Sequence, residues 1–237
     1  AILTERYIIK GIERILSILD SEKNERADLY ETFLQPTDDL IVYPYLTYDN
    51  VLVWKALLCI AEMMTGIKED QFCCSLKEQA GKIKEAVWEH CVFELDGKKI
   101  FAWSTDLEGR WNVYDEPPGS LQLLPFYGFC SSADEVYRNT VEYIRRPEYK
   151  YSFYGFNIAE IGCAHAPHPW VLSIANSLLC GRKKEFEEML PWLTMDQGIA
   201  CESVDEDTGE CATGEAFATC AGFLAYSLYQ AFYTPLT

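Results

Sequence analysis

The sequence predicts an all-α fold with functional loops at one end, and three observations support this prediction. Apolar residues recur at helical spacing through most of the 237 residues. One segment, residues 93–103, alternates around Asp96-Gly97 in the way that favours a β-hairpin. No region alternates strands with helices, as a parallel α/β fold would. We therefore expect about eight helices and one hairpin.

The first three helices are expected before the hairpin. The first covers residues 7–19, where apolar side chains recur at helical spacing until Asp20. The second follows the apolar run of residues 51–64, with Asp49 or Asn50 as its N-cap. The third extends over about residues 71–92, with its charged residues on one side. Beyond the hairpin, helices are expected near residues 120–129, 133–145, 169–179, 183–193 and 215–232.

Composition predicts one domain over residues 1–237. A hydrophobic content of 49% supports a substantial core, and there is no Gly/Ser-rich or Pro-rich linker and no repeat at a fixed period. The net charge of -17 argues against a nucleic-acid partner, because a phosphate backbone would be repelled. No signal peptide and no apolar run of about 18 residues is visible, so we expect no membrane partner.

The ten cysteines indicate a reducing compartment. They fall within apolar helical stretches, as Cys59, Cys180 and Cys220 do, and there a cysteine behaves as a small hydrophobic residue. A domain of this size does not need disulfides, so a cytoplasmic location is expected.

The first candidate catalytic residue is Glu202. It precedes an acidic reverse turn, Asp205 to Gly209, and its neighbours Cys201 and Val204 are uncharged. A carboxylate in a half-apolar setting before a buried helix is a candidate general base. The alternative is a solvated loop glutamate.

The second candidate site is the adjacent pair Asp115 and Glu116, which precedes Pro117-Pro118-Gly119. The prolines make the backbone rigid, and the first N–H groups of the next helix lie close by. Neighbouring like charges raise the pKa of at least one member, as a general acid requires. The alternative is that both acids cap the helix.

The third candidate site is the loop that carries His165, His168 and Trp170. Cys163 lies nearby, but the prolines stiffen the loop and no fourth ligand is evident, so no metal is expected. Trp170 can serve as a stacking platform for a sugar or as a core residue. The chain has three histidines and no Gly-x-Ser-x-Gly elbow, which argues against a serine or cysteine hydrolase.

Together these segments resemble the glucoamylase family of inverting glycoside hydrolases, which are helical six-hairpin (α/α) barrels. In that family an Asn-Pro-Trp helix start precedes a Glu-Gln-Val-Asp-x-x-Thr-Gly-Glu loop that carries the base. Residues 167–172, which include Pro169-Trp170, and residues 201–210 are similar to those two segments. Residues 115–120 are similar to the family's Glu-Glu-x-x-Gly segment. The resemblance implies that Asp115 is the general acid and Glu202 the general base.

Further similarities concern the sugar pocket. Residues 48–57 are similar to the family's Arg-Asp-Gly-Pro helix start, and the acid and base segments also resemble those of metal-independent α-mannosidases. The resemblance implies exo-acting, inverting hydrolysis of an α-glucoside or related α-glycoside without a cofactor. It leaves glucoside and mannoside open. Its implied substrate-binding residues are Tyr48, Asp49, Trp111, Glu116, His168 and Trp170.

Two departures from the family pattern shape the expectation. A complete barrel has about twelve helices, so we expect the C-terminal portion of a larger barrel, completed by a missing N-terminal segment or another chain. Asp115 also replaces the glucoamylase Glu and is shorter by one methylene. The rival expectations are a non-catalytic carbohydrate-binding or scaffold subunit on a shortened barrel, and a structural helical domain.

Overall fold

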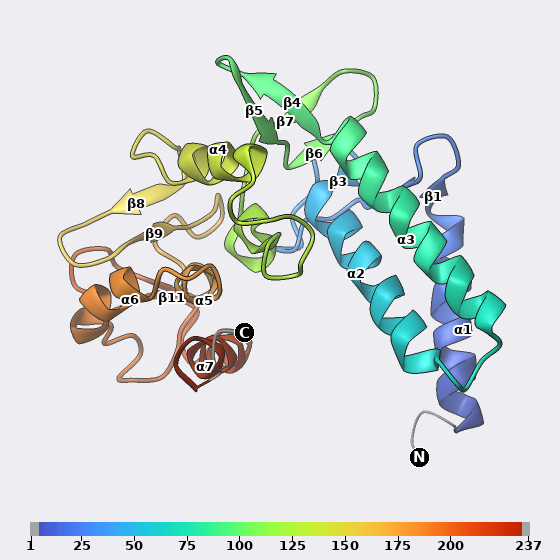
Figure 1. Cartoon of the computed structure of the whole chain (residues 1–237). Coiled ribbons are helices and arrows are strands. Elements are labelled where there is room, and N and C mark those ends of the chain that lie inside the picture. Colours follow the sequence, from blue (N-terminus) through green and yellow to red (C-terminus); the bar gives the residue numbers. More distant parts are fainter. Residues whose placement is uncertain (1–4, 234–237) are drawn as a thin grey trace. The chain divides into compact units, whose positions relative to one another are not determined.

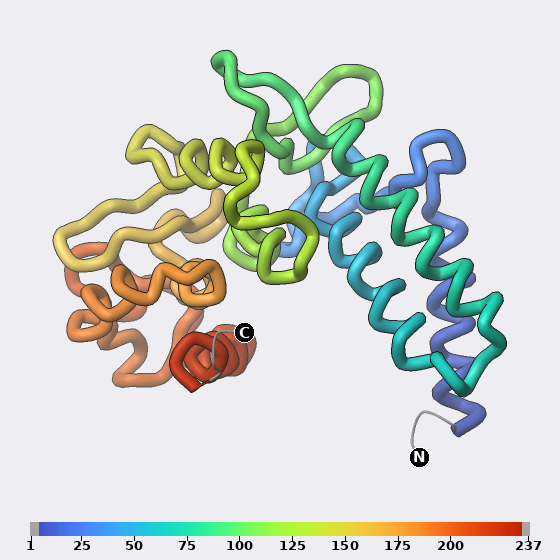
Figure 2. Tube along the Cα trace, in the orientation of Figure 1, coloured from blue at the N-terminus to red at the C-terminus, as the bar shows by residue number. Residues whose placement is uncertain are grey.

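The computed structural model describes residues 5–233 and divides the chain into two compact units, Ala1–Val113 and Tyr114–Thr237 (Figure 1). Figure 2 follows the Cα trace through the same elements. Each unit has its own helices, short antiparallel strands and buried core.

Three helices form most of the first unit: α1 (Arg6–Ser21), α2 (Thr47–Met64) and α3 (Asp70–His90). They confirm the three helices expected before the hairpin. Helices α2 and α3 pack against each other as a helical hairpin (Figure 1). The chain turns between them at Gly66, whose φ of 77° lies in the left-handed region that glycine tolerates.

The predicted β-hairpin is also present in the first unit. Strands β4 (Val92–Leu95) and β5 (Lys98–Phe101) pair antiparallel around Asp96 and Gly97, with φ values of 52° and 77°. Two consecutive positive φ values are the geometry of a type I′ turn, for which Asp-Gly is well suited. The unit also contains two small antiparallel sheets that the sequence did not indicate. One pairs β1 (Lys23–Asn24) with β2 (Leu29–Tyr30). The other has the strand order β3-β6-β7 and consists of β3 (Tyr45–Leu46), β6 (Ser104–Thr105) and β7 (Trp111–Asn112).

The predicted N-cap of the second helix is wrong. Helix α2 begins at Thr47, its N-cap is Leu46, and Asp49 and Asn50 lie inside the first turn. The Asn50 amide instead accepts a hydrogen bond from the Tyr30 N–H at 2.7 Å and donates to the carbonyls of Tyr30 at 3.1 Å and Leu46 at 2.9 Å. This buried amide therefore joins β2 to the start of α2.

The second unit combines helices with short strand pairs. Its α-helices are α4 (Glu135–Ile144), α5 (Val171–Leu179), α6 (Lys183–Met189) and α7 (Ala218–Tyr233). The 3₁₀ turns are η2 (Pro117–Gly119), η3 (Leu121–Leu123) and η4 (Leu190–Trp192). Strands β8 (Ser152–Tyr154) and β9 (Ala159–Ile161) form one antiparallel pair, and β10 (Ser203–Val204) and β11 (Cys211–Thr213) form another.

Two expectations for the second unit are wrong. Residues 120–129 form only the short turn η3 and further turns, because Pro125 lacks a backbone N–H and Gly128 has a φ of 78°. The expectation of a single hairpin fails because the additional strands are two or three residues long. Strands of that length are too short to display alternation.

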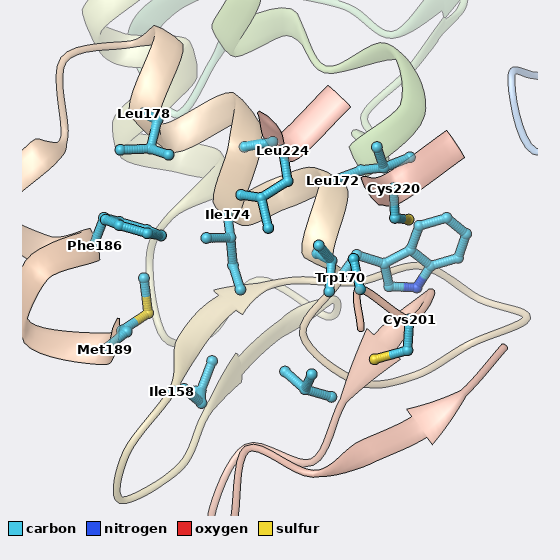
Figure 3. Close-up of a cluster of buried hydrophobic side chains, with 14 of the residues drawn as sticks. Ile158, Trp170, Leu172, Ile174, Leu178, Phe186, Met189, Cys201, Cys220 and Leu224 are labelled. Carbon is cyan, nitrogen blue, oxygen red and sulfur yellow. The ribbon is translucent and has the colours of Figure 1, made fainter. Parts of the chain in front are cut away.

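Helix α5 is the centre of the second core. Every residue from 171 to 178 is buried, and the helix packs against α7. Figure 3 shows Ile174 and Leu224 in this cluster together with Trp170, Cys201 and Cys220. All ten cysteines are free thiols, and Cys201 and Cys220 pack as small apolar side chains, as the sequence indicated.

A buried ion pair between Arg145 and Glu160 fastens the C-terminal end of α4 to β9 and α5. The Arg145 guanidinium donates to both oxygens of the Glu160 carboxylate at 3.1 Å. The Ser173 and Ser177 hydroxyls donate to the same carboxylate at 2.7 Å and 2.5 Å. Because Glu160 is 1% exposed, its charge depends on these partners.

Replacing Arg145 should destabilise the second unit strongly. Arg145→Met leaves the Glu160 charge buried without its counter-ion, so we expect a loss of about 3 to 5 kcal/mol in the free energy of unfolding. Urea titration followed by circular dichroism measures it. Arg138→Met, an exposed position on the same helix α4, is the matched control. Equal stability of the two variants would contradict this role for the ion pair.

Candidate active site

The backbone of Glu202 is attached to the second core. Its N–H lies 3.2 Å from the carbonyl of Thr213 and 3.0 Å from that of Gly214, and its own carbonyl accepts a hydrogen bond from the Val171 N–H at 3.0 Å. Val171 is the first residue of α5. The Glu202 segment is therefore held between β11 and the N-terminal end of the buried helix.

The Glu202 carboxylate has two different environments. Oε2 accepts a hydrogen bond from the Thr213 hydroxyl at 2.7 Å, whereas Oε1 lies 3.9 Å from His165 Nε2. The side chain keeps 20% of its surface exposed. One oxygen is therefore fixed by the chain, and the partly exposed carboxylate is able to accept a proton from a bound water.

The reverse turn expected after Glu202 is present. The Asp205 carboxylate accepts hydrogen bonds from the N–H groups of Asp207 and Thr208, which also lower the pKa of Asp205. Gly209 has a φ of 71°, and a Cβ there would lie 1.9 Å from the Trp192 carbonyl oxygen. Only glycine fits at this position.

Asp115 is completely buried, and the chain binds both of its oxygens. Oδ1 accepts the Leu121 N–H and Oδ2 accepts the Ser120 hydroxyl, each at 2.7 Å. Burial raises the pKa of Asp115 to about 8, while the bonds from Ser120 and Leu121 lower it in part and the Glu116 charge raises it. The carboxyl is thus protonated at neutral pH, and it also caps the turn η3.

Glu116 is buried beside Asp115. Its Oε2 accepts a hydrogen bond from the Tyr114 hydroxyl at 3.2 Å. Neither carboxyl has exposed surface. The acid role of Asp115 and the substrate-binding role of Glu116 therefore stay predictions.

Helix α5 connects the two predicted catalytic segments. Its Asn176 amide donates to the Pro117 carbonyl at 2.6 Å, and its Val171 N–H donates to the Glu202 carbonyl. The two attachment points are separated by five positions on the helix, which is about 7.5 Å along its axis at 1.5 Å per residue. The second unit therefore joins the Asp115 and Glu202 segments to one rigid element.

The third candidate loop lies in the same unit. The His168 ring pairs with the Glu206 carboxylate at 3.0 Å, so it is tied to the turn that follows Glu202. Trp170 is 3% exposed, donates from Nε1 to the Ala166 carbonyl at 2.9 Å and belongs to the core cluster. Its indole contacts the His165 ring edge-on, with centroids 5.3 Å apart. Its buried position matches the core alternative for this tryptophan.

The other predicted binding residues belong to the first unit. Asp49 is half-buried, and burial raises its pKa to about 6. Tyr48 is buried, while Trp111 is 38% exposed, stacks on Phe93 at 5.2 Å and donates to the His90 carbonyl. Of these, Asp49 combines partial exposure with a raised pKa, which is the property of a general acid.

Sequence reasoning missed one contact of the Glu202 site and did not single out one further acidic pair, which lies in the first unit. Thr213 binds Glu202 from eleven positions away, and pairing of strands across the acidic turn was the signal that could have located it. Asp38 and Asp39 are another of several pairs of adjacent acidic residues in the chain, the signal used for residues 115 and 116. Asp38 has a φ of 63°, and Asp39 accepts the Thr37 hydroxyl at 3.2 Å.

Residues 5–233 contain neither a candidate metal cluster nor a candidate membrane-spanning helix. Within that range no three or more His, Cys, Asp or Glu side chains are grouped to hold a metal ion, and His165 and His168 are directed at Glu202 and Glu206 instead. Nor does any helix in that range combine the length and apolar character of a membrane span.

Comparison with known proteins gives consistent matches. The family model of metal-independent α-mannosidases, GH125, matches residues 16–228. The Meiotically up-regulated gene 157 protein of Schizosaccharomyces pombe is 27% identical over 191 residues, which cover 77% of this chain and 38% of that protein.

Solved structures match in the same way. A metal-independent α-mannosidase of Streptococcus pneumoniae, in a non-productive complex with α-1,6-mannobiose, superposes with a TM-score of 0.77 and 22% identity, covering 88% of this chain and 52% of the other. A bacterial glucoamylase bound to acarbose superposes with a TM-score of 0.62 and 16% identity. This match covers 79% of this chain and 33% of the glucoamylase. These matches confirm the six-hairpin (α/α) fold class and the resemblance to both families. The chain spans about half the length of the mannosidase it matches, and it spans a smaller share of the other two relatives.

The buried Asp115 should make stability depend on pH. Its pKa rises from 3.8 to about 8 on folding, so the stability contributed by the neutral carboxyl is complete below about pH 4 and is lost as pH rises through 8. Asp115→Asn keeps a neutral group that can accept from Leu121. We expect its melting temperature, relative to wild type, to increase between pH 5 and pH 8. Glu187→Gln, an exposed position, is the control. Parallel curves for wild type and Asp115→Asn would contradict the raised pKa.

Proposed function

We propose, because the chain belongs to the metal-independent α-mannosidase family GH125, that it is an exo-acting, inverting glycoside hydrolase that releases a terminal α-linked sugar. Mannose is the first candidate sugar, and glucose is the second, since the same fold occurs in a glucoamylase. An oligosaccharide or simple glycoside is the partner that this activity requires.

The observation that carries the proposal is the environment of Glu202. Its carboxylate is fixed through Oε2 by Thr213 and remains partly exposed. Fixing one oxygen in a partly apolar surrounding prepares the other to deprotonate water. The segment is also attached by its carbonyl to the buried helix α5, which keeps the carboxylate in place during a reaction.

In the proposed reaction Glu202 removes a proton from water, and the oxygen of that water forms a bond to the anomeric carbon. The glycosidic bond breaks, and its oxygen receives a proton from a general acid. Asp115 remains our predicted acid, and its high pKa supplies the proton at neutral pH. Inversion requires about 6.5 to 9.5 Å between the two carboxyls. Because Asp115 has no exposed surface, it reaches a substrate only if the chain around it moves.

Substrate, assembly and compartment are proposed from the relatives and the cysteines. The Streptococcus pneumoniae enzyme was solved with α-1,6-mannobiose, so this disaccharide is the first substrate to test. Because the chain spans 52% of that enzyme, we propose that further chain or a second subunit completes the barrel. Ten free thiols favour a reducing compartment, and we propose the cytoplasm.

Removing the base should abolish most activity without loss of binding. Glu202→Gln keeps the hydrogen-bond acceptor for Thr213 but takes up no proton, so we expect kcat on α-1,6-mannobiose to fall by about 10² to 10⁴. Glu210→Gln, exposed in the same loop, is the matched control and should keep wild-type kcat. Calorimetric titration with mannose checks that binding is retained. Wild-type kcat in Glu202→Gln rules out its role as the base.

The general acid can be identified by how strongly the activity lost in its variant depends on the leaving group of the substrate. Asp115→Asn should lose activity on a natural disaccharide yet regain most of it on an aryl α-mannoside whose phenol leaves without protonation. Asp49→Asn and Asp39→Asn, measured on both substrates, complete the comparison. If Asp49→Asn or Asp39→Asn shows this selective loss and Asp115→Asn does not, the acid role of Asp115 is disproved.

A non-catalytic carbohydrate-binding or scaffold subunit is the second candidate function. The sequestered Asp115 favours it, because a carboxyl whose two oxygens are both bound by the chain serves a structural role without touching a sugar. Mannose binding with no hydrolysis of any α-mannoside or α-glucoside would select this alternative.

A further inference from the structure

We infer that Thr213 is a positioning residue of the active site: its hydroxyl holds Oε2 of Glu202 and so assigns proton transfer from water to Oε1. The inference rests on the proposed function of Glu202 as the base. Thr213 itself does not touch the reacting atoms in this account.

The direction of the hydrogen bonds follows from the chemistry of the groups. A carboxylate can only accept, so the single hydroxyl proton of Thr213 is committed to Oε2 at 2.7 Å. The Ser203 hydroxyl lies 2.6 Å from Thr213 Oγ1, and with the Thr213 proton committed, Ser203 must be the donor in that pair. A chain therefore runs from Ser203 through Thr213 to Glu202, and each bond polarises the next.

The strand pairing fixes this chain in place. Ser203 and Thr213 are directly opposite each other in the antiparallel pair of β10 and β11. Cross-strand neighbours are about 4.5 to 5.5 Å apart at Cβ, which suits a contact between two short hydroxyl side chains. The register therefore places the Thr213 hydroxyl beside the carboxylate of Glu202, the residue immediately before β10.

Gly214 closes the other side of the Glu202 side chain. A Cβ at residue 214 would lie 2.5 Å from the Glu202 Cβ, and its φ of 61° is left-handed. The backbone at Gly214 thus packs directly on the stem of the base, and its carbonyl lies 3.0 Å from the Glu202 N–H. The carboxylate is held by a hydroxyl at one oxygen and by backbone along its stem.

This arrangement gives the two oxygens separate tasks. Oε2 is occupied by Thr213, and Oε1 faces His165 at 3.9 Å, a distance too long for a hydrogen bond. In the hydrolytic step the water O–H bond breaks, its proton passes to Oε1, and the water oxygen bonds to the anomeric carbon. Without Thr213 the carboxylate is free to rotate, and fewer of its conformations present a lone pair to the water.

The test replaces the hydroxyl with a group of the same shape. Thr213→Val should lower kcat on α-1,6-mannobiose by about 10- to 100-fold, which corresponds to the loss of one hydrogen bond to a charged group. KM should stay unchanged, because the proposed role of this hydroxyl is to bind the Glu202 carboxylate and not the sugar. Thr213→Ser should restore kcat. Thr194→Val, which removes a hydroxyl bonded to the Gly209 carbonyl, is the control and should match wild type.

A readout independent of activity separates this inference from the proposed function. The ¹³C chemical shift of the Glu202 carboxyl should move in Thr213→Val and return in Thr213→Ser, whether or not the chain hydrolyses a glycoside. Thr213→Ala serves if the valine variant does not fold. An unchanged carboxyl shift, or an equal fall of kcat in the valine and serine variants, would overturn the inference. If the carboxyl shift moves in Thr213→Val but the wild-type protein hydrolyses no glycoside, only the proposed function is rejected.

Discussion

The burial of helix α5 is the constraint on which the second unit depends. All residues from 171 to 178 are enclosed, so the helix cannot shift without opening the core. Its first N–H binds the Glu202 carbonyl, and its Asn176 amide binds the turn after Asp115. Glu160, on β9, is bound to the same helix through two serines. One apolar helix thereby sets the positions of the groups we assign to catalysis.

The carboxyl groups of the second unit show how burial and partners separate chemical roles. Glu160 is buried with an arginine and stabilises the fold, because its charge is compensated. Burial raises the pKa of Asp115 to about 8, although the hydrogen bonds from Ser120 and Leu121 lower it in part. Glu202 is partly exposed, with a single strong donor on one oxygen. Three acidic residues thus have three different environments, and we assign them a structural role, the proposed acid role and the proposed base role, respectively.

Local signals made much of this structure predictable. The Asp96-Gly97 turn, the helices of the first unit and the reverse turn after Glu202 follow from spacing and turn chemistry. Contacts between distant segments could not be predicted from these signals. Asn50 binds Tyr30, and Thr213 binds Glu202 from a strand that is too short to show alternation. The ion pair of Arg145 and Glu160 could not be predicted, because the sequence does not distinguish a buried arginine–glutamate pair from two solvated residues. The resemblance to known hydrolases identified the fold class beyond what periodicity could.

The central claim is that this fold carries an inverting hydrolytic site built around Glu202. It is tested most directly by following the first product of α-1,6-mannobiose hydrolysis by ¹H NMR before mutarotation. The account predicts that β-mannose appears first and converts to the equilibrium mixture. Initial release of α-mannose, or no release of mannose from any α-mannoside, would contradict it.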